Sequence, residues 1–359
     1  MLPMIRIFPI VFLLSISTAF AQVLDEMSPA KDLIQELRRI HTPKGIETLE
    51  QINLNGSQQW ISIRGKDRNN PVLLFLHGGP ASPTMPTAWA FQGPWEDYFT
   101  VVQWDQRAAG KNWLNTDTTS VAAELHFRTL IQDAYQLVEH LRLRFGQEKI
   151  FLMGYSYGAG IGIRMAARIP EKLHAYIGIG QMAPGNPEAV IYQTLLRLAQ
   201  DAQNAEALEE LKSLAPYPNP IGQTPVGKLL AVRKWSRKFN GGWYGKSDFE
   251  LLFALPSLSP EYTIEDIDNL AKSTSWISRR ILSNGGAPDF PQSFDIPMIL
   301  MMGRHDLHTP YESAIKYWES ISAPYKQVIT FDFSGHVPFL EEPGKFLVEL
   351  VNKVKPLAD

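Results

Sequence analysis

A serine within a short glycine-containing motif is the residue of this sequence best suited to act as a nucleophile. The motif Gly-Tyr-Ser-Tyr-Gly spans residues 154–158 and has Ser156 at its centre. It follows the apolar run Ile150–Met153, which is typical of a buried strand, and it opens the helical pattern Ala159–Ala167. A sharp turn between such a strand and such a helix exposes the serine hydroxyl, and glycines permit close packing around it. We therefore expect Ser156 to be a catalytic nucleophile.

A serine hydroxyl needs a neighbouring base, and a histidine late in the chain could supply it. His336 follows the predicted strand 327–333 within the sequence Ser-Gly-His. Asp306 follows the predicted strand 298–302 and could orient the imidazole and stabilise its protonated form. Loops at the carboxyl ends of parallel strands meet at one edge of a sheet, so these side chains can converge. The sequence thus predicts a Ser156–His336–Asp306 triad.

Other acidic and histidine side chains lie close to these positions. Asp332 is the alternative acid, but it falls within the predicted strand 327–333, where its carboxylate would point away from His336. His305 and His308 could bind a metal ion, but two histidines in a loop without a third suitably spaced ligand are more typical of exposed side chains. We expect no metal and no cofactor.

Attack by Ser156 on a carbonyl group would create an oxyanion, which preorganised N–H groups must stabilise. The backbone N–H of Tyr157, directly after the nucleophile, is one expected donor. The second is expected from Gly79 in His-Gly-Gly-Pro at 77–80, which follows the predicted strand 71–76. These residues predict hydrolysis of an ester or amide through a covalent acyl-enzyme.

Continuous apolar runs that alternate with helical stretches predict the sheet that would position these residues. Such runs are typical of strands buried on both faces of a parallel sheet. They span residues 71–76, 99–104, 150–153, 175–179, 298–302 and 327–333. Asn-Gly at 55–56 separates the segments 46–54 and 58–63, which predicts an antiparallel hairpin. The predicted fold class is α/β, with a mostly parallel sheet and an N-terminal antiparallel hairpin.

The segment between the fourth and fifth of these apolar runs predicts an inserted subdomain. It contains a helical pattern at 193–214 and an aromatic-rich stretch at 233–248. A structureless loop of this length would be unusual in a compact domain. We therefore expect a helical cap at residues 183–291, with the catalytic core divided between residues 22–182 and 292–359.

The first 21 residues have the features of a secretory signal peptide. Arg6 supplies positive charge, Ile7–Ile16 is almost wholly apolar, and Ala19-Phe20-Ala21 provides a small-x-small cleavage site. The alternative is an N-terminal membrane anchor, but the apolar run is shorter than the roughly 20 residues that a membrane span needs. We therefore expect an exported protein, periplasmic or secreted, with no stable membrane insertion after cleavage. A short amphipathic helix is expected next, at Pro29–Ile40.

The overall composition excludes several classes of protein. The chain has 359 residues, is 45% hydrophobic and 20% charged, and carries a formal net charge of −3. This composition is that of a folded globular protein. Nucleic-acid-binding proteins normally show a basic stripe, and none is present, so we expect a small-molecule or short-peptide substrate instead. The chain has no cysteine, so its stability cannot come from disulfides.

Several motifs together resemble the α/β-hydrolase superfamily. They are HGGPA at 77–81, WDQRAAGK at 104–111, GYSYGAG at 154–160, GRHD at 303–306 and SGH at 334–336. The HGGP and DQR-x-x-G-K pair is similar to the proline iminopeptidase (prolyl aminopeptidase) branch. The resemblance covers roughly residues 45–182 and 292–359. It implies a cofactor-free serine hydrolase with a helical cap, which releases an N-terminal residue from small peptides.

The cap departs from that branch in one element. Larger prolyl aminopeptidases carry Trp-x-x-Trp-Glu, whose glutamate binds the free α-amine of the substrate. The nearest match is Trp235-Ser236-Arg237-Lys238-Phe239, in which Phe239 stands in place of the carboxylate. The resemblance makes Trp235 and Phe239 candidate substrate-binding residues, and Tyr155, next to the expected nucleophile, is a third candidate. Other cap carboxylates could replace the missing glutamate: Glu188, Glu206, Glu209, Glu210 and Glu250.

Two other functions remain open. Without the charge-assisted bond that selects a free N-terminus, a carboxylesterase or lactonase acting on a bulky neutral ester is the alternative. A non-catalytic binding protein on the same scaffold is less well supported, because no element of the predicted triad or oxyanion hole is missing.

Overall fold

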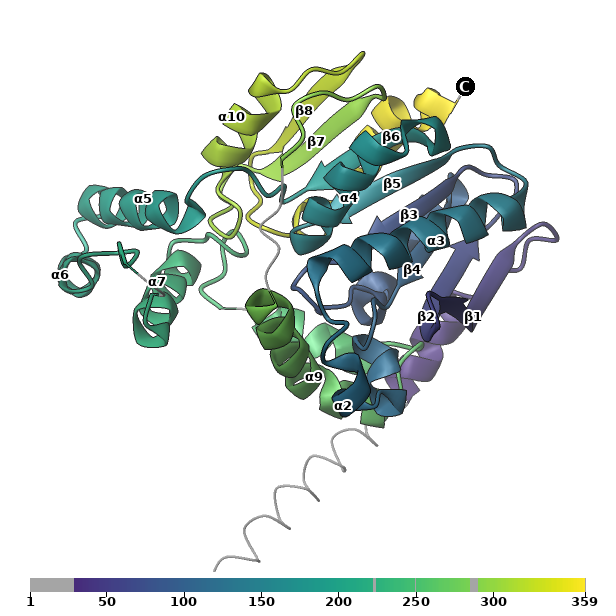
Figure 1. The fold of residues 1–359 in the computed structure, drawn as a ribbon, viewed down its shortest axis with the longest axis horizontal. Helices are drawn as coiled ribbons and strands as arrows, with labels where there is room; N and C mark the ends of the chain where they lie inside the picture. Colours follow the sequence, from purple (N-terminus) through teal and green to yellow (C-terminus); the bar gives the residue numbers. More distant parts are fainter. Residues whose placement is uncertain (1–28, 222–223, 249, 285–289, 359) are drawn as a thin grey trace, which may run out of the picture.

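An eight-stranded sheet forms the centre of the protein in the computed structural model, which describes residues 29–221, 224–248, 250–284 and 290–358. Its strand order is β1-β2-β4-β3-β5-β6-β7-β8 (Figure 1). β1 (Ile46–Leu54) and β2 (Ser57–Gly65) pair as an antiparallel hairpin around Asn55-Gly56, and β2 also pairs antiparallel with β4 (Thr100–Trp104). The predicted N-terminal hairpin is confirmed.

The other strand pairs are parallel. These strands are β3 (Val72–Leu76), β5 (Ile150–Tyr155), β6 (Leu173–Ile179), β7 (Met298–Gly303) and β8 (Lys326–Phe331). Every residue of β3 and β7 is buried, as expected for parallel strands covered on both faces. The α/β fold class predicted from the apolar runs is therefore confirmed.

Helices cover the two faces of the sheet. Because side chains alternate along a strand, Leu74 of β3 packs on one face and Phe75 on the other. The first face is covered by α3 (Phe127–Phe145), α4 (Tyr157–Arg168) and α10 (Tyr311–Ser320) (Figure 1). The second is covered by α11 (Pro338–Glu341), α12 (Pro343–Glu349) and the short 3-10 helices Met85–Ala90 and Gly93–Asp97. The apolar side chains on both faces of the sheet are thus buried.

The described residues between β6 and β7 are mainly helical. They form α5 (Pro187–Asp201), α6 (Ala205–Ser213), α7 (Val226–Lys238), α8 (Glu250–Ala254) and α9 (Ile264–Ser283). The single helical pattern predicted at 193–214 is two helices, because Asn204 caps the start of α6 and accepts the N–H of Ala207. In Figure 1, α5, α6 and α7 lie together beside the sheet, away from β1 and β2.

Buried polar residues of the Trp-Asp-Gln-Arg-Ala-Ala-Gly-Lys motif attach α9 to the core. Lys111 Nζ lies 2.7 Å from Asp266 Oδ2 at the start of α9, and both side chains are buried. Asp105 accepts hydrogen bonds from the Lys111 N–H, at 2.8 Å, and from the Tyr262 hydroxyl. Burial raises the pKa of Asp105 to about 7. This motif therefore holds the loop after β4 and the start of α9 in fixed positions.

Two expectations concern the N-terminal region. The expected helix at Pro29–Ile40 is observed over residues 29–37. The predicted signal peptide at residues 1–21 lies outside the described residues. Among the helices that the structure describes, none has the length and apolar character needed to cross a membrane.

Candidate active site

Ser156 lies at the turn between β5 and α4 with a backbone conformation that L-residues rarely adopt. Its φ is 53° and its ψ is −117°. The Ser156 N–H donates to the carbonyl of Ile179 at the end of β6, at 2.9 Å. A side chain at Gly158 would lie 2.2 Å from the Leu76 carbonyl oxygen, so the turn can pack against β3 only with glycine there. The predicted strand–turn–helix context of the motif is present.

His336 and Asp306 form a hydrogen-bonded pair. His336 Nδ1 lies 2.8 Å from Asp306 Oδ2, and Asp306 is 1% exposed. The other carboxylate oxygen, Oδ1, accepts the N–H groups of His308 and Thr309, at 2.8 and 2.9 Å. Burial opposes ionisation of Asp306, but the charge and hydrogen bond of His336 hold the pKa of this carboxyl below its usual value. The pair can orient an imidazole and stabilise its protonated form.

A partly buried carboxylate, that of Glu341, fixes the loop that carries His336. Its Oε1 accepts the N–H of Gly335 at 2.8 Å, and its Oε2 accepts the N–H of Val337 at 2.9 Å. The N–H of His336 itself donates to Gly242 O at 2.9 Å. Glu341 thus holds the residues on both sides of His336. Sequence reasoning missed it, since nothing in its neighbourhood distinguishes it from a surface glutamate.

Ser156 and His336 both lie next to the carboxyl end of β6. Ser156 bonds to the backbone of Ile179, and the next residue, Gly180, has a φ of 52°. A side chain at Gly180 would lie 2.8 Å from His336 Cε1. Within the described part of the chain, no hydrogen bond joins Ser156 Oγ to the His336 ring. Such bonds in serine hydrolases often tighten only when substrate binds.

The His-Gly-Gly-Pro loop lies directly against Ser156. A side chain at Gly78 would lie 2.8 Å from Ser156 Cβ. Gly79 has a φ of 114°, which favours glycine. Tyr157 is the first residue of α4, and the first turn of a helix leaves N–H groups without intrahelical acceptors. The two predicted oxyanion-hole residues are therefore on the segments that flank Ser156.

Buried hydrogen bonds of His77 also hold the His-Gly-Gly-Pro loop in place. His77 Nδ1 lies 2.9 Å from Gly78 O, and Nε2 accepts the N–H of Gln106 at 3.2 Å. Burial lowers the pKa of His77 to about 4, so this imidazole is neutral near pH 7. His77 thus supports the loop rather than acting as a second base.

Comparison with known proteins identifies the family. The family model described as alpha/beta hydrolase fold matches residues 71–343. The chain belongs to this family. It is 27% identical over 310 residues to "Probable aminopeptidase YbaC" of Bacillus subtilis strain 168. The alignment covers 84% of this chain and 95% of that relative. It is 26% identical over 298 residues to the proline iminopeptidase of Clostridium botulinum, in an alignment that covers 79% of this chain and 89% of that relative.

Solved structures agree on the fold. The crystal structure of a proline iminopeptidase from Mycobacterium smegmatis matches with a TM-score of 0.58 at 14% identity, covering 87% of this chain and 99% of that one. The predicted α/β-hydrolase fold and the predicted resemblance to proline iminopeptidases are thus confirmed. The protein is a proline iminopeptidase-like α/β hydrolase.

Two expectations about the surroundings of this hydrolase's His336 were wrong. Asp332 does not lie in a strand: β8 ends at Phe331, and Asp332 is half exposed, with its carboxylate 2.6 Å from Arg304 Nε. His308 is not an exposed loop histidine. Its ring stacks on that of His336 at a centroid distance of 4.9 Å. Among the described residues, no group of three or more His, Cys, Asp or Glu side chains is arranged to bind a metal ion.

The candidate substrate-binding residues occupy different environments. Trp235 is 1% exposed within the packed interior of α5–α7, and its Nε1 donates to Glu210 at 3.0 Å. Phe239, at the end of α7, lines a cavity of about 300 Å³ together with Asp306. The Tyr155 ring lies 5.0 Å from that of His336. Phe239 and Tyr155 are thus next to the pair, whereas Trp235 packs inside the helical segment. Their contact with substrate stays a prediction.

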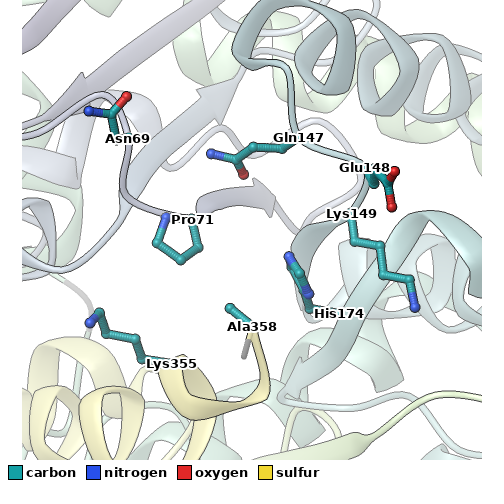
Figure 2. A pocket seen from close by; sticks show the side chains of 8 residues that line it. All are labelled: Asn69, Pro71, Gln147, Glu148, Lys149, His174, Lys355 and Ala358. Atoms are coloured by element: carbon teal, nitrogen blue, oxygen red, sulfur yellow. The ribbon is translucent and has the colours of Figure 1, made fainter.

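A larger cavity lies at the opposite ends of the strands. It has a volume of about 470 Å³, and Figure 2 shows the side chains that line it. Among them, Pro71 directly precedes β3, Lys149 directly precedes β5, and His174 is near the start of β6. Ligands of open α/β sheets bind at the carboxyl ends of strands. This cavity is therefore separate from the site around Ser156.

Proposed function

We propose that the protein is an exported serine hydrolase in which Ser156, His336 and Asp306 act as a triad. One observation carries the proposal: the 2.8 Å hydrogen bond between His336 Nδ1 and buried Asp306, next to the strand–turn–helix that presents Ser156. A carboxylate that holds Nδ1 leaves Nε2 to accept a proton from a nucleophile. The family supports a hydrolytic reaction on this fold.

The mechanism passes through an acyl-enzyme. Ser156 Oγ attacks the substrate carbonyl carbon, and its proton moves to His336 Nε2. The oxyanion accepts hydrogen bonds from the N–H groups of Gly79 and Tyr157. His336 then gives the proton to the leaving group as the scissile bond breaks. Water, deprotonated by His336, cleaves the acyl-enzyme and restores the Ser156 hydroxyl, so no cofactor takes part.

The proposed substrate is a small peptide from which the N-terminal residue is released. Support comes from relatives named as an aminopeptidase and as proline iminopeptidases, which align over most of both chains. A peptide amide and an ester pass through the same tetrahedral oxyanion, so the triad itself does not distinguish them.

An esterase or lactonase is the second candidate, and the state of the cap carboxylates favours it. The Glu188 carboxylate is hydrogen-bonded to Arg233 and Tyr217, and that of Glu210 to Lys234 and Trp235. The other three carboxylates considered as amine ligands are exposed: Glu206, Glu209 and Glu250. A free α-amine would therefore have to displace an existing ion pair or find a different partner.

A paired rate assay separates the two candidates. The mature protein is given prolyl β-naphthylamide and a neutral short-chain p-nitrophenyl ester, each with and without a serine-directed phosphonate. Phosphonate-sensitive cleavage mainly of the prolyl amide is the expected result. Cleavage of the ester alone would establish the esterase, and cleavage of either that is insensitive to phosphonate would contradict the serine mechanism.

Export is proposed from the N-terminal sequence. Positive charge, an apolar run and Ala19-Phe20-Ala21 occur in the order of a cleavable signal. N-terminal sequencing of protein recovered from periplasmic and culture fractions should begin at Gln22. An intact N-terminus in the cytoplasmic or membrane fraction would contradict both the cleavage and the export.

A further inference from the structure

The residues that follow α7 are hydrogen-bonded to the loops that carry Asp306 and His336. The Gly241 carbonyl accepts the N–H of Leu307 at 2.9 Å, and the Gly242 carbonyl accepts that of His336 at 2.9 Å. The Gly241 N–H bonds back to Ser236 O, inside the last turn of α7, at 2.8 Å. Side chains on this turn are therefore fixed relative to the proposed triad.

Four cations lie on the last two turns of α7, and they divide into two pairs. Lys234 forms an ion pair with Glu210, and Lys238 Nζ lies 4.7 Å from the centre of the Trp235 ring. These two lysines are thus engaged with α6 and with Trp235. The remaining two, Arg233 and Arg237, are four positions apart and share one face of the helix.

The two arginines have spare hydrogen-bonding capacity. Arg233 Nη2 pairs with Glu188, but its Nη1 is buried and has no hydrogen-bond partner in the part of the chain that the structure describes. No described carboxylate forms an ion pair with Arg237, which is only partly exposed. A buried guanidinium nitrogen without an acceptor is costly, and a ligand carboxylate would satisfy it.

The last turn of α7, which carries Arg237, is linked to the proposed triad through Gly241 and Gly242, which accept the N–H groups of Leu307 and His336. Burial and the charge of His336 lower the pKa of His308, Asp306 raises it, and the positive charges of Arg233 and Arg237 lower it further. The His308 ring in turn stacks on His336. The charges of the two arginines therefore act on this side of the proposed triad, opposed by that of Asp306, and each of them favours an anionic group on a bound substrate.

We propose that Arg237, together with Arg233, binds a carboxylate of the substrate, so that the site prefers substrates with an anionic group close to the scissile bond. A planar guanidinium suits a carboxylate because it can donate two parallel hydrogen bonds. In a dipeptide, the C-terminal carboxylate is such a group. This inference rests on the proposed function, because it assigns a substrate class to the same site.

Matched substrate pairs test the preference. On the leaving-group side, prolyl-alanine is compared with prolyl-alanine amide, and 4-acetoxybenzoate with its methyl ester. On the acyl side, mono(4-nitrophenyl) succinate is compared with 4-nitrophenyl butyrate. We expect the native enzyme to have a higher kcat/KM for the anionic member in at least one pair. In Arg237→Gln, that anionic-to-neutral ratio should fall by roughly 10- to 100-fold, the value of a charge-assisted hydrogen bond.

The controls separate charge from packing. Arg237→Lys should restore part of the ratio, and Lys238→Gln, one residue away but engaged with Trp235, should leave the ratio as in the native enzyme. If Arg237→Gln does not fold, inhibition of the native enzyme by benzoate and by benzamide is compared instead, and stronger inhibition by benzoate is expected. The inference would be overturned if the anionic-to-neutral ratio were one or less in every pair, or if Arg237→Gln left the ratio unchanged. Equal inhibition of the native enzyme by benzoate and by benzamide would overturn it as well.

Failure of this inference and failure of the proposed function give different results. If Ser156→Ala loses all turnover but substitution of Arg237 does not change the anionic-to-neutral ratio, only the anion preference is overturned. Turnover that persists in Ser156→Ala would overturn the serine mechanism. An Arg237 effect on the substrate ratio could still be measured in that case.

Discussion

The imidazole of His308 stacks on that of His336, with ring centroids 4.9 Å apart and ring planes 19° apart. The catalytic histidine proposed for this hydrolase therefore has a second imidazole against one of its faces. Burial, more than any neighbouring charge, lowers the pKa of His308 to about 3. A neutral His308 can remain in contact with His336 when the latter takes up a proton, because it adds no second positive charge.

The pKa of His308 predicts a pH-dependent contribution to stability. Its value is about 3 in the folded protein and 6.5 ordinarily, so between these values the unfolded chain binds a proton that the folded protein does not. Stability from this group is therefore lost as the pH falls below 6.5. Relative to His308→Phe, the native protein should lose about 1–2 kcal/mol of unfolding free energy between pH 7 and pH 5. Urea denaturation at both pH values measures this, and parallel changes in the two proteins would contradict it.

The strained backbone conformation at Ser156 predicts that glycine at this position gives a more stable protein than alanine. A φ of 53° is strained for serine or alanine but not for glycine. Ser156→Gly and Ser156→Ala should both abolish turnover, and Ser156→Gly should be more stable than Ser156→Ala by about 1 kcal/mol. Denaturant unfolding of the two variants measures the difference. Equal stabilities would mean that the turn relaxes when the hydroxyl is removed, and detectable turnover in either variant would exclude Ser156 as the nucleophile.

Substitution of the two candidate acids, Asp306 and Asp332, should have very different effects on kcat. Asp306→Asn should lower kcat by about 10³- to 10⁴-fold, because an amide favours the wrong tautomer of His336. Asp332→Asn is the matched control: Asp332 is half exposed and paired with Arg304, so its removal should leave kcat near the native value. Steady-state rates of both variants on one substrate decide between them. A small effect at Asp306 with a large one at Asp332 would reverse the assignment.

The hydrogen bonds of Glu341 to Gly335 and Val337 predict that this carboxylate holds His336 in position for catalysis. In Glu341→Gln, the new side-chain amide would present one NH₂ group to backbone N–H donors that now meet a carboxylate oxygen. The substitution should therefore lower kcat by roughly tenfold, with a smaller change in KM, because it displaces His336 rather than the substrate. Glu342→Gln is the comparison, because Glu342 accepts from Phe333 and Ser334, neither of which is adjacent to His336 in the chain. A change in KM alone, or an equal kcat effect at Glu342, would argue against this role.

The sequence predicts the central sheet well because its signals are local. Buried parallel strands are continuous apolar runs, and the hairpin has its own Asn-Gly turn. The end of β8 was predicted two residues too late, since Phe333 continues the apolar pattern. In the structure, the Phe333 N–H donates to the Glu342 carboxylate at 3.0 Å instead of to a neighbouring strand. That competing acceptor comes from a segment whose position no local pattern gives.

The surroundings of the site could not be predicted from local patterns for the same reason. His308 reads as an exposed loop residue, but the Asp306 carboxylate accepts its N–H at 2.8 Å and folds the loop back, which places the ring against His336. Trp235 was predicted to bind substrate by alignment with a family motif. Its burial depends on how α5, α6 and α7 pack together, which the motif does not specify.

Covalent labelling of Ser156 tests the central claim most directly. The native protein is incubated with a fluorophosphonate, digested and analysed by mass spectrometry, with Ser156→Ala and Asp332→Asn treated in parallel. We predict one adduct per chain, on the peptide that contains Ser156, with labelling kept in Asp332→Asn and lost in Ser156→Ala. An adduct on another residue, or equal labelling of Ser156→Ala, would contradict the proposed serine mechanism.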